Sequence, residues 1–242
     1  MKNYLLALIG STTLLAASHV EAKTILFSGY NWTIKNSAGK VGPGSNYFSD
    51  SSNNVWVDTQ GRLHLKITKQ GGRWYCAEVV SQSSFGYGTY RFYLDSAVEN
   101  LDKNAVLGLF TWSDDPAWHN REIDFEASRW GQANNLNAQY VVQPYTNPQN
   151  IVRFNIPPGS IQTIHSFNWQ STSVSFLSVK GTNPAPTNQS DIIQQWTNTG
   201  SDVPQAGGEN ARMNLWLFNG TKPSNGQSVE VIVSKFEFVP GP

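Results

Sequence analysis

The sequence has little of what disulfide-rich, nucleic-acid-binding and membrane-spanning proteins need. Its 242 residues include one cysteine, Cys76, so no disulfide bond can form within the chain. Charged residues make up 14% of the chain, and the formal net charge is +0. Because nucleic acids and anionic membranes attract basic surfaces, this balance favours neither as a partner. Cys76 lies in the strand-like run 73–80, which favours a small buried side chain over a catalytic thiol.

Long apolar runs are also scarce, and the one at the start of the chain has the pattern of a signal peptide. A positive start at Lys2 precedes the apolar run 4–15, and small residues precede position 23. The run is shorter than the roughly 20 residues that a membrane span needs. We therefore expect a signal peptide over 1–22, cleaved after Ala22, and a secreted mature chain, extracellular or periplasmic. A retained anchor and a buried helix are the alternatives.

Amphipathic helices are absent too, apart from a weak helical pattern at 191–196. Most of the chain consists of short alternating or apolar runs broken by Gly, Asn, Ser and Pro. Strands are expected at 63–68, 88–94, 106–112, 136–142, 174–179, 213–218 and 229–238. Many strands at short spacing, without alternating helices, predict an all-β protein with two packed antiparallel sheets, a sandwich or jelly roll. No break in composition divides 23–242, so we expect a single domain there.

Aromatic residues, in contrast, are plentiful, with nine tryptophans in the chain. Tryptophan covers a large apolar area and keeps one polar group, so a surplus indicates stacking surfaces as well as core. Phe110 and Trp112 are two residues apart in an expected strand, which places both on one face. Core packing is the alternative for every aromatic residue, and it is the better interpretation for Trp56 and Trp169.

An acidic strand is the feature around which the sequence is organised. In residues 121–129, Glu122, Asp124 and Glu126 alternate with apolar residues, which is the period of a β-strand. Three carboxylates therefore share one face, where each raises the pKa of the others. The apolar residues between them indicate that the opposite face packs against a core. Three like charges on one face repel one another and destabilise the strand, so their presence indicates a chemical role.

Retaining glycoside hydrolysis uses two carboxyl groups about 5 to 5.5 Å apart. Strand positions i and i+4 are roughly 13 Å apart at Cα, and two glutamate side chains on a curved sheet can close most of that gap. Asp124 lies between them, where its negative charge would help to keep one glutamate protonated. Spacing alone does not assign the two roles. The acids could also form an ordinary exposed face, or a calcium site, although collinear strand carboxylates rarely supply six oxygens.

Several motifs around this strand resemble glycoside hydrolase family 16, most closely its lichenases (endo-1,3-1,4-β-glucanases). The resemblance runs from about 46 to 238, and the motifs follow the same order along the chain. They are Cys-Ala-Glu at 76–78, Ser-Phe-Gly-Tyr-Gly-Thr-Tyr-Arg-Phe at 84–92, Phe-Thr-Trp at 110–112, Glu-Ile-Asp-Phe-Glu at 122–126, His-Ser-Phe-Asn-Trp-Gln at 165–170 and Met-Asn-Leu-Trp at 213–216.

The resemblance implies a concanavalin-like jelly roll with a sugar cleft on its concave sheet. Glu122 would be the nucleophile, Glu126 the acid/base, and Asp124 the residue that assists them. Neither a cofactor nor a bound metal is expected. The residues that would bind substrate are Glu78, Phe110, Trp112, Asn214, Trp216, Gln139, Asn46 and Trp130.

The sequence also departs from the lichenase pattern. Val80 stands where lichenases carry a substrate-binding arginine, and Val141 where they carry a tyrosine. The cysteine that would pair with Cys76 is absent, and 234–238 lacks the aspartate that resembles a calcium ligand in relatives. These changes leave the catalytic class intact and bear on which glucan linkage is cut.

The expected function is that of a secreted endo-β-glycanase that hydrolyses β-1,3-1,4- or β-1,3-glucan with retention. We expect a monomer whose partner is the polysaccharide, with no nucleic acid and no membrane once the signal peptide is removed. The alternatives are a non-catalytic carbohydrate-binding protein on the same fold, a structural or adhesive β-sandwich, and an enzyme acting on xyloglucan or a galactan. Transglycosylation is a further alternative to hydrolysis.

Overall fold

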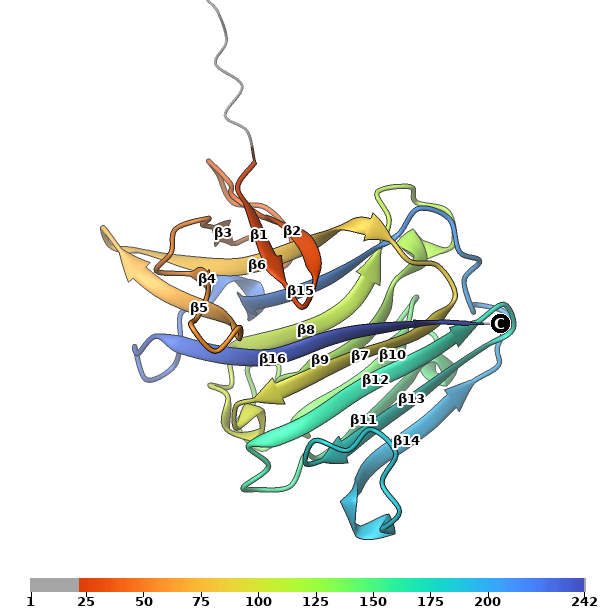
Figure 1. Ribbon diagram of the computed structural model, residues 1–242. Coiled ribbons are helices and arrows are strands. Elements are labelled where there is room, and N and C mark those ends of the chain that lie inside the picture. The colour runs from red at the N-terminus through yellow and green to blue at the C-terminus, as the bar shows by residue number, and fades with distance from the viewer. Residues whose placement is uncertain (1–21, 242) are drawn as a thin grey trace, which may run out of the picture.

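A computed structural model describes residues 22–241, so the expected signal peptide lies outside the described residues except for Ala22. The described chain contains sixteen strands and five short 3-10 helices. Nearly all of the strand pairs are antiparallel, and the strands form two facing layers that merge at one end (Figure 1). Within this range, no helix is long and apolar enough to cross a membrane.

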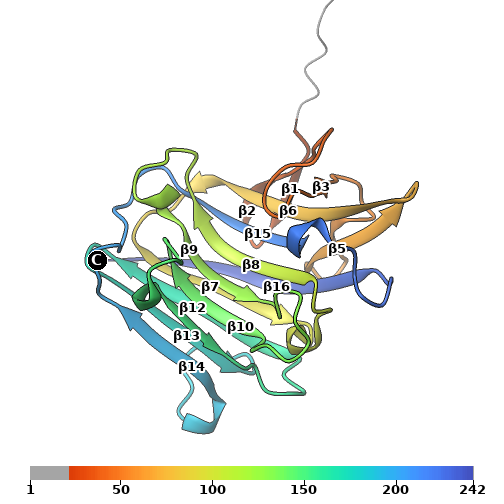
Figure 2. The ribbon, with the colours of Figure 1, turned by 180° about the vertical axis from the view of Figure 1, so that it is seen from behind.

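The first layer contains the acidic strand and lies toward the viewer in Figure 2, with β8, β9 and β10 side by side. Its hydrogen-bonded order is β11-β10-β9-β8-β15-β6-β2-β1. The strands are β1 (Thr24–Phe27), β2 (Tyr30–Ile34), β6 (Arg73–Ser84), β8 (Ala105–Trp112), β9 (Ile123–Ala127), β10 (Ala138–Val142), β11 (Ile151–Phe154) and β15 (Asn210–Leu217).

The second layer has the order β4-β5-β16-β7-β12-β13-β14. Its strands are β4 (Val55–Val57), β5 (Leu63–Gln70), β7 (Gly88–Asp95), β12 (Gln162–Gln170), β13 (Ser173–Lys180), β14 (Ile192–Asn198) and β16 (Val229–Pro240). At the end where the layers merge, β5 pairs with β6, and β3 (Tyr47–Phe48) runs parallel to β6. The 3-10 helices are η1 (Val98–Asn100), η2 (His119–Arg121), η3 (Pro148–Asn150), η4 (Gln189–Asp191) and η5 (Phe218–Gly220).

This architecture confirms the expected all-β jelly-roll sandwich, and each of the seven expected strands is present. The helix that the weak pattern at 191–196 suggested is not present, so this prediction is wrong. Ile192–Asn198 forms β14, an edge strand paired with β13, and only Gln189–Asp191 is helical. Trp196 stacks on its cross-strand partner Phe176 with ring centroids 5.4 Å apart, and such aromatic pairs stabilise strands.

Aromatic side chains fill the space between the layers. Phe125 of β9 stacks on His165 of β12, and Tyr140 of β10 stacks on Phe176 of β13, with ring centroids 3.8 Å and 4.7 Å apart. Ile123 and Ala127 are fully buried on the same side of β9. The apolar residues of the acidic strand therefore face the core, as the alternation predicted, and the register of the strand is fixed.

Two further expectations concern single residues. Cys76 is fully buried, and burial raises the pKa of its thiol to about 12, so it is the inert apolar side chain that the sequence indicates. Trp169 belongs to the core, as expected. Trp56 does not, because it is half-buried and stacks on His64 with ring centroids 4.4 Å apart.

Candidate active site

The acidic strand is shorter than the sequence suggested, because β9 runs only from Ile123 to Ala127. Glu122 directly precedes it and follows four consecutive residues with left-handed backbone, Trp118 to Arg121, whose φ angles lie between 51° and 62°. Left-handed conformations cost free energy in residues other than glycine, so neighbouring contacts must hold this turn. The turn determines where Glu122 projects.

Arg121 anchors this turn, although its side chain is almost fully buried. Its Nε donates to the carbonyl of Gln205 at 2.9 Å, and its Nη1 donates to Asp115 at 3.0 Å. The hydroxyl of Thr111 donates to the backbone carbonyl of Arg121 at 2.7 Å. A Cβ at Gly207 would lie 2.7 Å from the guanidinium, so only glycine leaves room for it. These contacts fix the backbone immediately before Glu122.

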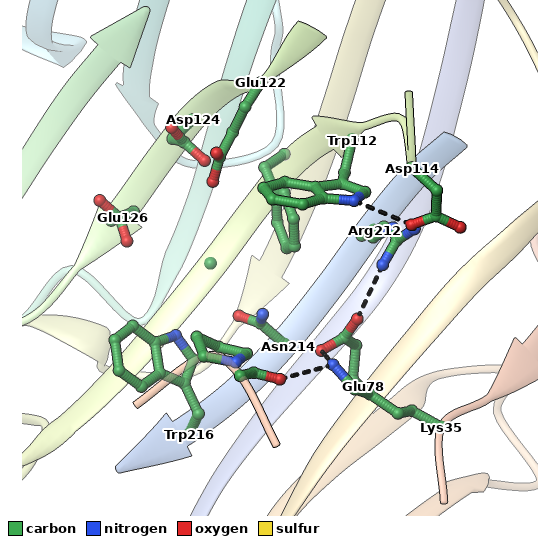
Figure 3. A pocket seen from close by; sticks show the side chains of 14 residues that line it. Lys35, Glu78, Trp112, Asp114, Glu122, Asp124, Glu126, Arg212, Asn214 and Trp216 are labelled. Atoms are coloured by element: carbon green, nitrogen blue, oxygen red, sulfur yellow. Dashed lines mark hydrogen bonds and ion pairs between the residues drawn. The ribbon is translucent and has the colours of Figure 1, made fainter. Parts of the chain in front are cut away.

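Glu122, Asp124 and Glu126 all line one pocket with a volume of about 370 Å³ (Figure 3). Figure 3 shows Glu122 and Asp124 turned toward each other, with Glu78 and Asn214 on the opposite side of the pocket. Five of the eight residues expected to bind substrate line the same pocket: Glu78, Phe110, Trp112, Asn214 and Trp216. The other lining residues are Lys35, Gly42, Pro43, Gly108, Asp114 and Arg212.

Strand register explains how residues far apart in the sequence reach this pocket. Glu126 faces Gly108 on β8, Gly108 faces Asn214 on β15, and Asn214 faces Glu78 on β6. A Cβ at Gly108 would lie 2.5 Å from Asn214 Oδ1. Glycine at this position therefore keeps the floor of the pocket open between Glu126 and Asn214.

Burial raises the pKa values of all three acids. Burial first, and then the charge of Glu126, raises the pKa of Glu122 to about 8. Burial raises the pKa of Glu126 to about 7, although a hydrogen bond from Gln139 and the charge of Arg153 oppose it. Asp124 is 3% exposed, and burial raises its pKa well above the usual range. The pocket therefore does not hold three negative charges near neutral pH.

Asp124 was expected to act as an anion, and its burial disfavours the charged form. Asp124 and Glu122 share a hydrogen bond that raises the pKa of Asp124 and lowers that of Glu122. This bond therefore favours a protonated Asp124 beside an ionised Glu122. Gln143 Nε2 donates to Asp124 Oδ2 at 3.2 Å, which opposes part of the rise in the pKa of Asp124. Burial thus favours a neutral Asp124, and its hydrogen bond offsets part of the rise in the pKa of Glu122.

Two cations in the pocket, Lys35 and Arg212, were not identified from the sequence. Lys35 Nζ lies 2.8 Å from Glu78 Oε2 and donates to the carbonyl of Gly42 at 2.9 Å. Arg212 contacts Glu78 more loosely, at 3.4 Å, and lies over the ring of Trp112 at 5.9 Å. The charge of Arg212 also lowers the pKa of Glu122.

Arg212 lies directly across the β6–β15 pair from Val80. Val80 is the position at which the family resemblance implies an arginine, so a guanidinium reaches this part of the pocket from the neighbouring strand. The absence of arginine at position 80 was the one signal in the sequence that could have prompted a search for a replacement such as Arg212. The register that supplies Arg212 is visible only in the structure.

Two polar atoms of pocket-lining residues have no hydrogen-bond partner in the described part of the chain. They are Arg212 Nε, a donor, and Asn214 Oδ1, an acceptor, and both atoms are buried. Buried polar groups are nearly always hydrogen-bonded. A ligand rich in hydroxyl groups would supply both kinds of partner, since each hydroxyl donates one hydrogen bond and accepts others.

The remaining three expected binding residues do not line the pocket. Gln139 is 5% exposed and donates to Glu126 Oε2 at 2.7 Å. Asn46 Nδ2 donates to the backbone carbonyls of Pro43 and Leu217 at 2.9 Å and 2.8 Å, so it holds the loop that carries Pro43. Each of these two amides therefore already has a partner within the protein.

Trp130 would share the face of Glu126 only if the strand continued, and β9 ends at Ala127. The backbone turns at Trp130, where φ is 51°. Its ring packs edge-on against Trp216 and Phe218, with centroids 6.3 Å and 5.6 Å apart. Trp130 thus supports the pocket residue Trp216 from the side.

Comparisons with known proteins bear on the fold. No protein-family model matches the chain, and no curated protein matches it. Several solved structures, in contrast, are similar to the chain. A β-glucanase of Bacillus licheniformis is 19% identical with a TM-score of 0.61, over 87% of this chain and 92% of that one. A lichenase from a mouse hindgut metagenome is 17% identical with a TM-score of 0.57, over 86% and 92%.

A third similar structure is an immunostimulatory antigen of Mycobacterium tuberculosis, described as a pseudo β-1,3-glucanase. It is 17% identical with a TM-score of 0.61, over 87% of this chain and 91% of that one. These neighbours confirm the resemblance to glycoside hydrolase family 16 at the level of the fold. At such low identities the likeness shows the fold alone.

Proposed function

We propose that this protein is a retaining endo-β-glycanase that hydrolyses β-1,3-1,4- or β-1,3-glucan. The observation that carries the proposal is the set of three acids in one pocket, where burial raises the pKa values of both Glu122 and Glu126. Because these two groups interact, the pair holds one proton over a range near neutral pH. A retaining mechanism needs one ionised and one protonated carboxyl group at that pH.

In the proposed reaction Glu122 attacks the anomeric carbon, and Glu126 gives its proton to the oxygen of the departing sugar. The glycosidic bond breaks and a bond from carbon to the Glu122 carboxylate forms. Glu126, now ionised, takes a proton from water, and the resulting attack releases the sugar from Glu122. Asp124 supports the first step because its proton is directed at the Glu122 carboxylate.

The rest of the pocket suits a polysaccharide. Trp112 and Trp216 offer flat apolar surfaces of the kind that stack on sugar rings. Glu78 is 1% exposed and Asn214 is 2% exposed, so both are held rigidly on the side opposite the acids. Their polar atoms, with Arg212, can bind sugar hydroxyls. A substrate bound there would lie across β9, β8, β15 and β6.

Product analysis on laminarin, barley glucan, xyloglucan and agarose tests the substrate class and the reaction. We expect reducing ends from laminarin or barley glucan, with the β-anomer formed first in a proton NMR time course. Glu122→Gln should remove this activity and leave sugar binding and the folded far-ultraviolet circular dichroism spectrum unchanged. Full activity of Glu122→Gln on the substrate that the wild type cleaves would overturn the assignment.

Azide rescue separates the two glutamates. In Glu122→Ala, azide can take the place of the missing nucleophile and should give an α-glycosyl azide from an activated β-glycoside. In Glu126→Ala, azide attacks the glycosyl-enzyme and should give the β-glycosyl azide. The opposite pairing of products would exchange the two roles.

A non-catalytic carbohydrate-binding protein is the second candidate, and the description of one similar structure as a pseudo β-1,3-glucanase favours it. Calorimetric titration with laminarin oligosaccharides distinguishes the candidates. Binding by the wild type with no reducing ends after prolonged incubation supports a binding protein. Binding by Glu122→Gln together with turnover by the wild type supports the enzyme.

The proposal includes export and a monomeric state. The pattern at 1–22 supports export with cleavage after Ala22. N-terminal sequencing of the exported chain should then begin at Lys23. Light scattering of the purified chain should give the mass of one copy, and the mass of a dimer would contradict the monomeric state.

A further inference from the structure

Three side chains stand in one row across the edge of the first layer. Arg153 of β11 faces Gln139 of β10, and Gln139 faces Glu126 of β9. Arg153 Nε donates to Gln139 Oε1 at 3.1 Å, and Gln139 Nε2 donates to Glu126 Oε2 at 2.7 Å. Hydrogen bonds thus lead from an exposed guanidinium to a buried amide and on to a carboxyl group in the pocket.

The chemistry of the two outer groups decides which way the amide points. A glutamine amide has an accepting oxygen at one end and a donating nitrogen at the other, whereas a guanidinium only donates. Arg153 can therefore bind only the oxygen end, which leaves the nitrogen end for Glu126. Gln139 is 5% exposed, so water does not easily replace either partner. If Arg153 were absent, the amide could turn over and present its oxygen to Glu126 instead.

We propose that Arg153 is a positioning residue for Glu126, because it holds the Gln139 amide with its N–H groups toward the Glu126 carboxyl. This inference rests on the function proposed above, in which Glu126 alternates between acid and base. An N–H donor favours the ionised carboxylate that accepts a proton from water, whereas a carbonyl oxygen would favour the protonated acid. Arg153 thereby sets the balance between the two forms of Glu126.

The other neighbours of Glu126 do not supply this function. Among residues 22–241, Gln139 is the only side chain that donates a hydrogen bond to it. Its titratable neighbours along the chain are Asp124 on β9 and Glu122 just before β9, both acids. On the other side Glu126 faces Gly108 of β8, which has no side chain. Across the next two strands follow Asn214 and then Glu78, and Glu78 is paired with Lys35.

Arg153 acts on Glu126 mainly through the amide, and its charge also lowers the pKa of Glu126 directly. Arg153 is exposed, so solvent screens its charge at the distance of Glu126. Gln139 contacts Glu126 directly, and its donor is buried. A lysine at position 153 still donates to Gln139 Oε1, so it should preserve the orientation in part, whereas methionine should abolish it.

Titration of Glu126 by NMR tests the proposal without turnover. The side-chain carboxyl carbons of glutamate are labelled with ¹³C, and the Glu126 signal is identified by its loss in Glu126→Gln. In Arg153→Met the pKa of Glu126 should rise by roughly half a unit to one unit, the scale of one oriented hydrogen bond to a carboxylate. Arg153→Lys should give a smaller rise.

Two controls make the result specific. Arg73→Met removes an exposed arginine from β6 of the same layer, with no hydrogen bond to the acids, and should leave the titration of Glu126 unchanged. In a Gln139→Leu background, Arg153→Met should add a clearly smaller shift, because the amide is gone and only the charge effect of Arg153 remains. A shift of equal size with and without Gln139, or no shift in Arg153→Met, would overturn the proposal.

The kinetic readout separates this inference from the proposed function. If the chain is an active glycosidase, the alkaline limb of the pH profile of kcat/KM should move upward in Arg153→Met by the same amount as the NMR titration. An inactive chain that shows the NMR shift would contradict the proposed function and support the role of Arg153. An active chain without the NMR shift would support the proposed function and contradict the role of Arg153.

Discussion

Phe125, on the core side of the acidic strand, stacks on His165 of the opposite layer, with ring centroids 3.8 Å apart and ring planes inclined by 16°. His165 in turn lies 2.7 Å from Ser178 Oγ and 3.0 Å from Thr163 Oγ1 through its two ring nitrogens. Phe125 stands between Asp124 and Glu126 in the sequence. The buried histidine therefore helps to fix the strand that carries the acids.

His165→Ala should destabilise the fold by about 2–4 kcal/mol, because it leaves a cavity beneath β9 and removes one hydrogen-bond partner from each of two buried hydroxyl groups. Lys180→Ala, at an exposed position on β13, is the control and should change the free energy of unfolding by less than about 0.5 kcal/mol. Chemical denaturation followed by tryptophan fluorescence measures both. Equal effects of the two substitutions would contradict a structural role for His165.

The same histidine should make stability depend on pH. Burial lowers the pKa of His165 from 6.5 to about 3 in the folded chain. Between these values the unfolded chain binds one more proton than the folded chain, so the free energy of unfolding falls as the pH falls. His165→Phe keeps a ring against Phe125 and removes the titration. Its stability should therefore decline less than that of the wild type between about pH 6.5 and about pH 4, and a parallel decline would contradict the assignment.

The sequence predicted the fold well where strands are long and alternate regularly, as in β5, β7 and β16. It predicted β14 poorly, since the run Ile192–Asn198 shows little alternation and becomes a strand through its pairing with β13. The short strands β3 and β4 were not expected, because two or three residues carry no periodic signal. They form by pairing with β6 and β5, which is a tertiary effect.

Asp124 substitutions test whether the aspartate acts as a donor. Asp124→Asn keeps an N–H group that can point at Glu122, whereas Asp124→Ala does not. We expect Asp124→Ala to lose about 10²–10³-fold in kcat and Asp124→Asn to lose less, on the scale of a single buried donor in an active site. In Asp124→Ala the acid limb of kcat/KM should also move to higher pH, because the hydrogen bond that lowers the pKa of Glu122 is gone.

An aspartate that acted as an anion would behave differently. Removal of a negative charge beside Glu122 would lower the pKa of that residue, and the acid limb would move to lower pH. Asp124→Asn and Asp124→Ala would then affect activity equally, since both remove the charge. Steady-state kinetics from about pH 4 to about pH 9 distinguishes the two roles by the direction of the movement.

Gly108→Ala tests the open floor of the pocket. The added Cβ would lie 2.5 Å from Asn214 Oδ1, so the side chain of Asn214 must move from the position that faces Glu126 across β8. We expect kcat/KM to fall about 10–100-fold, since misplacement by an ångström carries costs of that size. Gly39→Ala, with no atom within 4 Å of its added Cβ, should leave kcat/KM unchanged.

Alternation alone predicted that the three acids share one face of their strand and that Phe110 and Trp112 share one face of theirs, and the family resemblance placed both sets in one cleft. It could not supply Arg212, because the contact of Arg212 with Glu78 joins residues 134 positions apart through strand register. The sequence suggested a charged Asp124, whereas burial, which the sequence does not show, raises the pKa of this residue. Gln139 was expected to bind substrate, and the structure gives it Glu126 as a partner instead.

Trapping the glycosyl-enzyme tests the central claim most directly. A 2-deoxy-2-fluoro-β-glucoside of two or three sugar units with an activated leaving group reacts with a retaining enzyme and hydrolyses slowly, so the covalent intermediate accumulates. Mass spectrometry of the intact chain should show the addition of one glycosyl residue, and peptide mapping should place it on Glu122. An adduct on another residue, or glucan hydrolysis by the wild type with inverted products, would contradict the account.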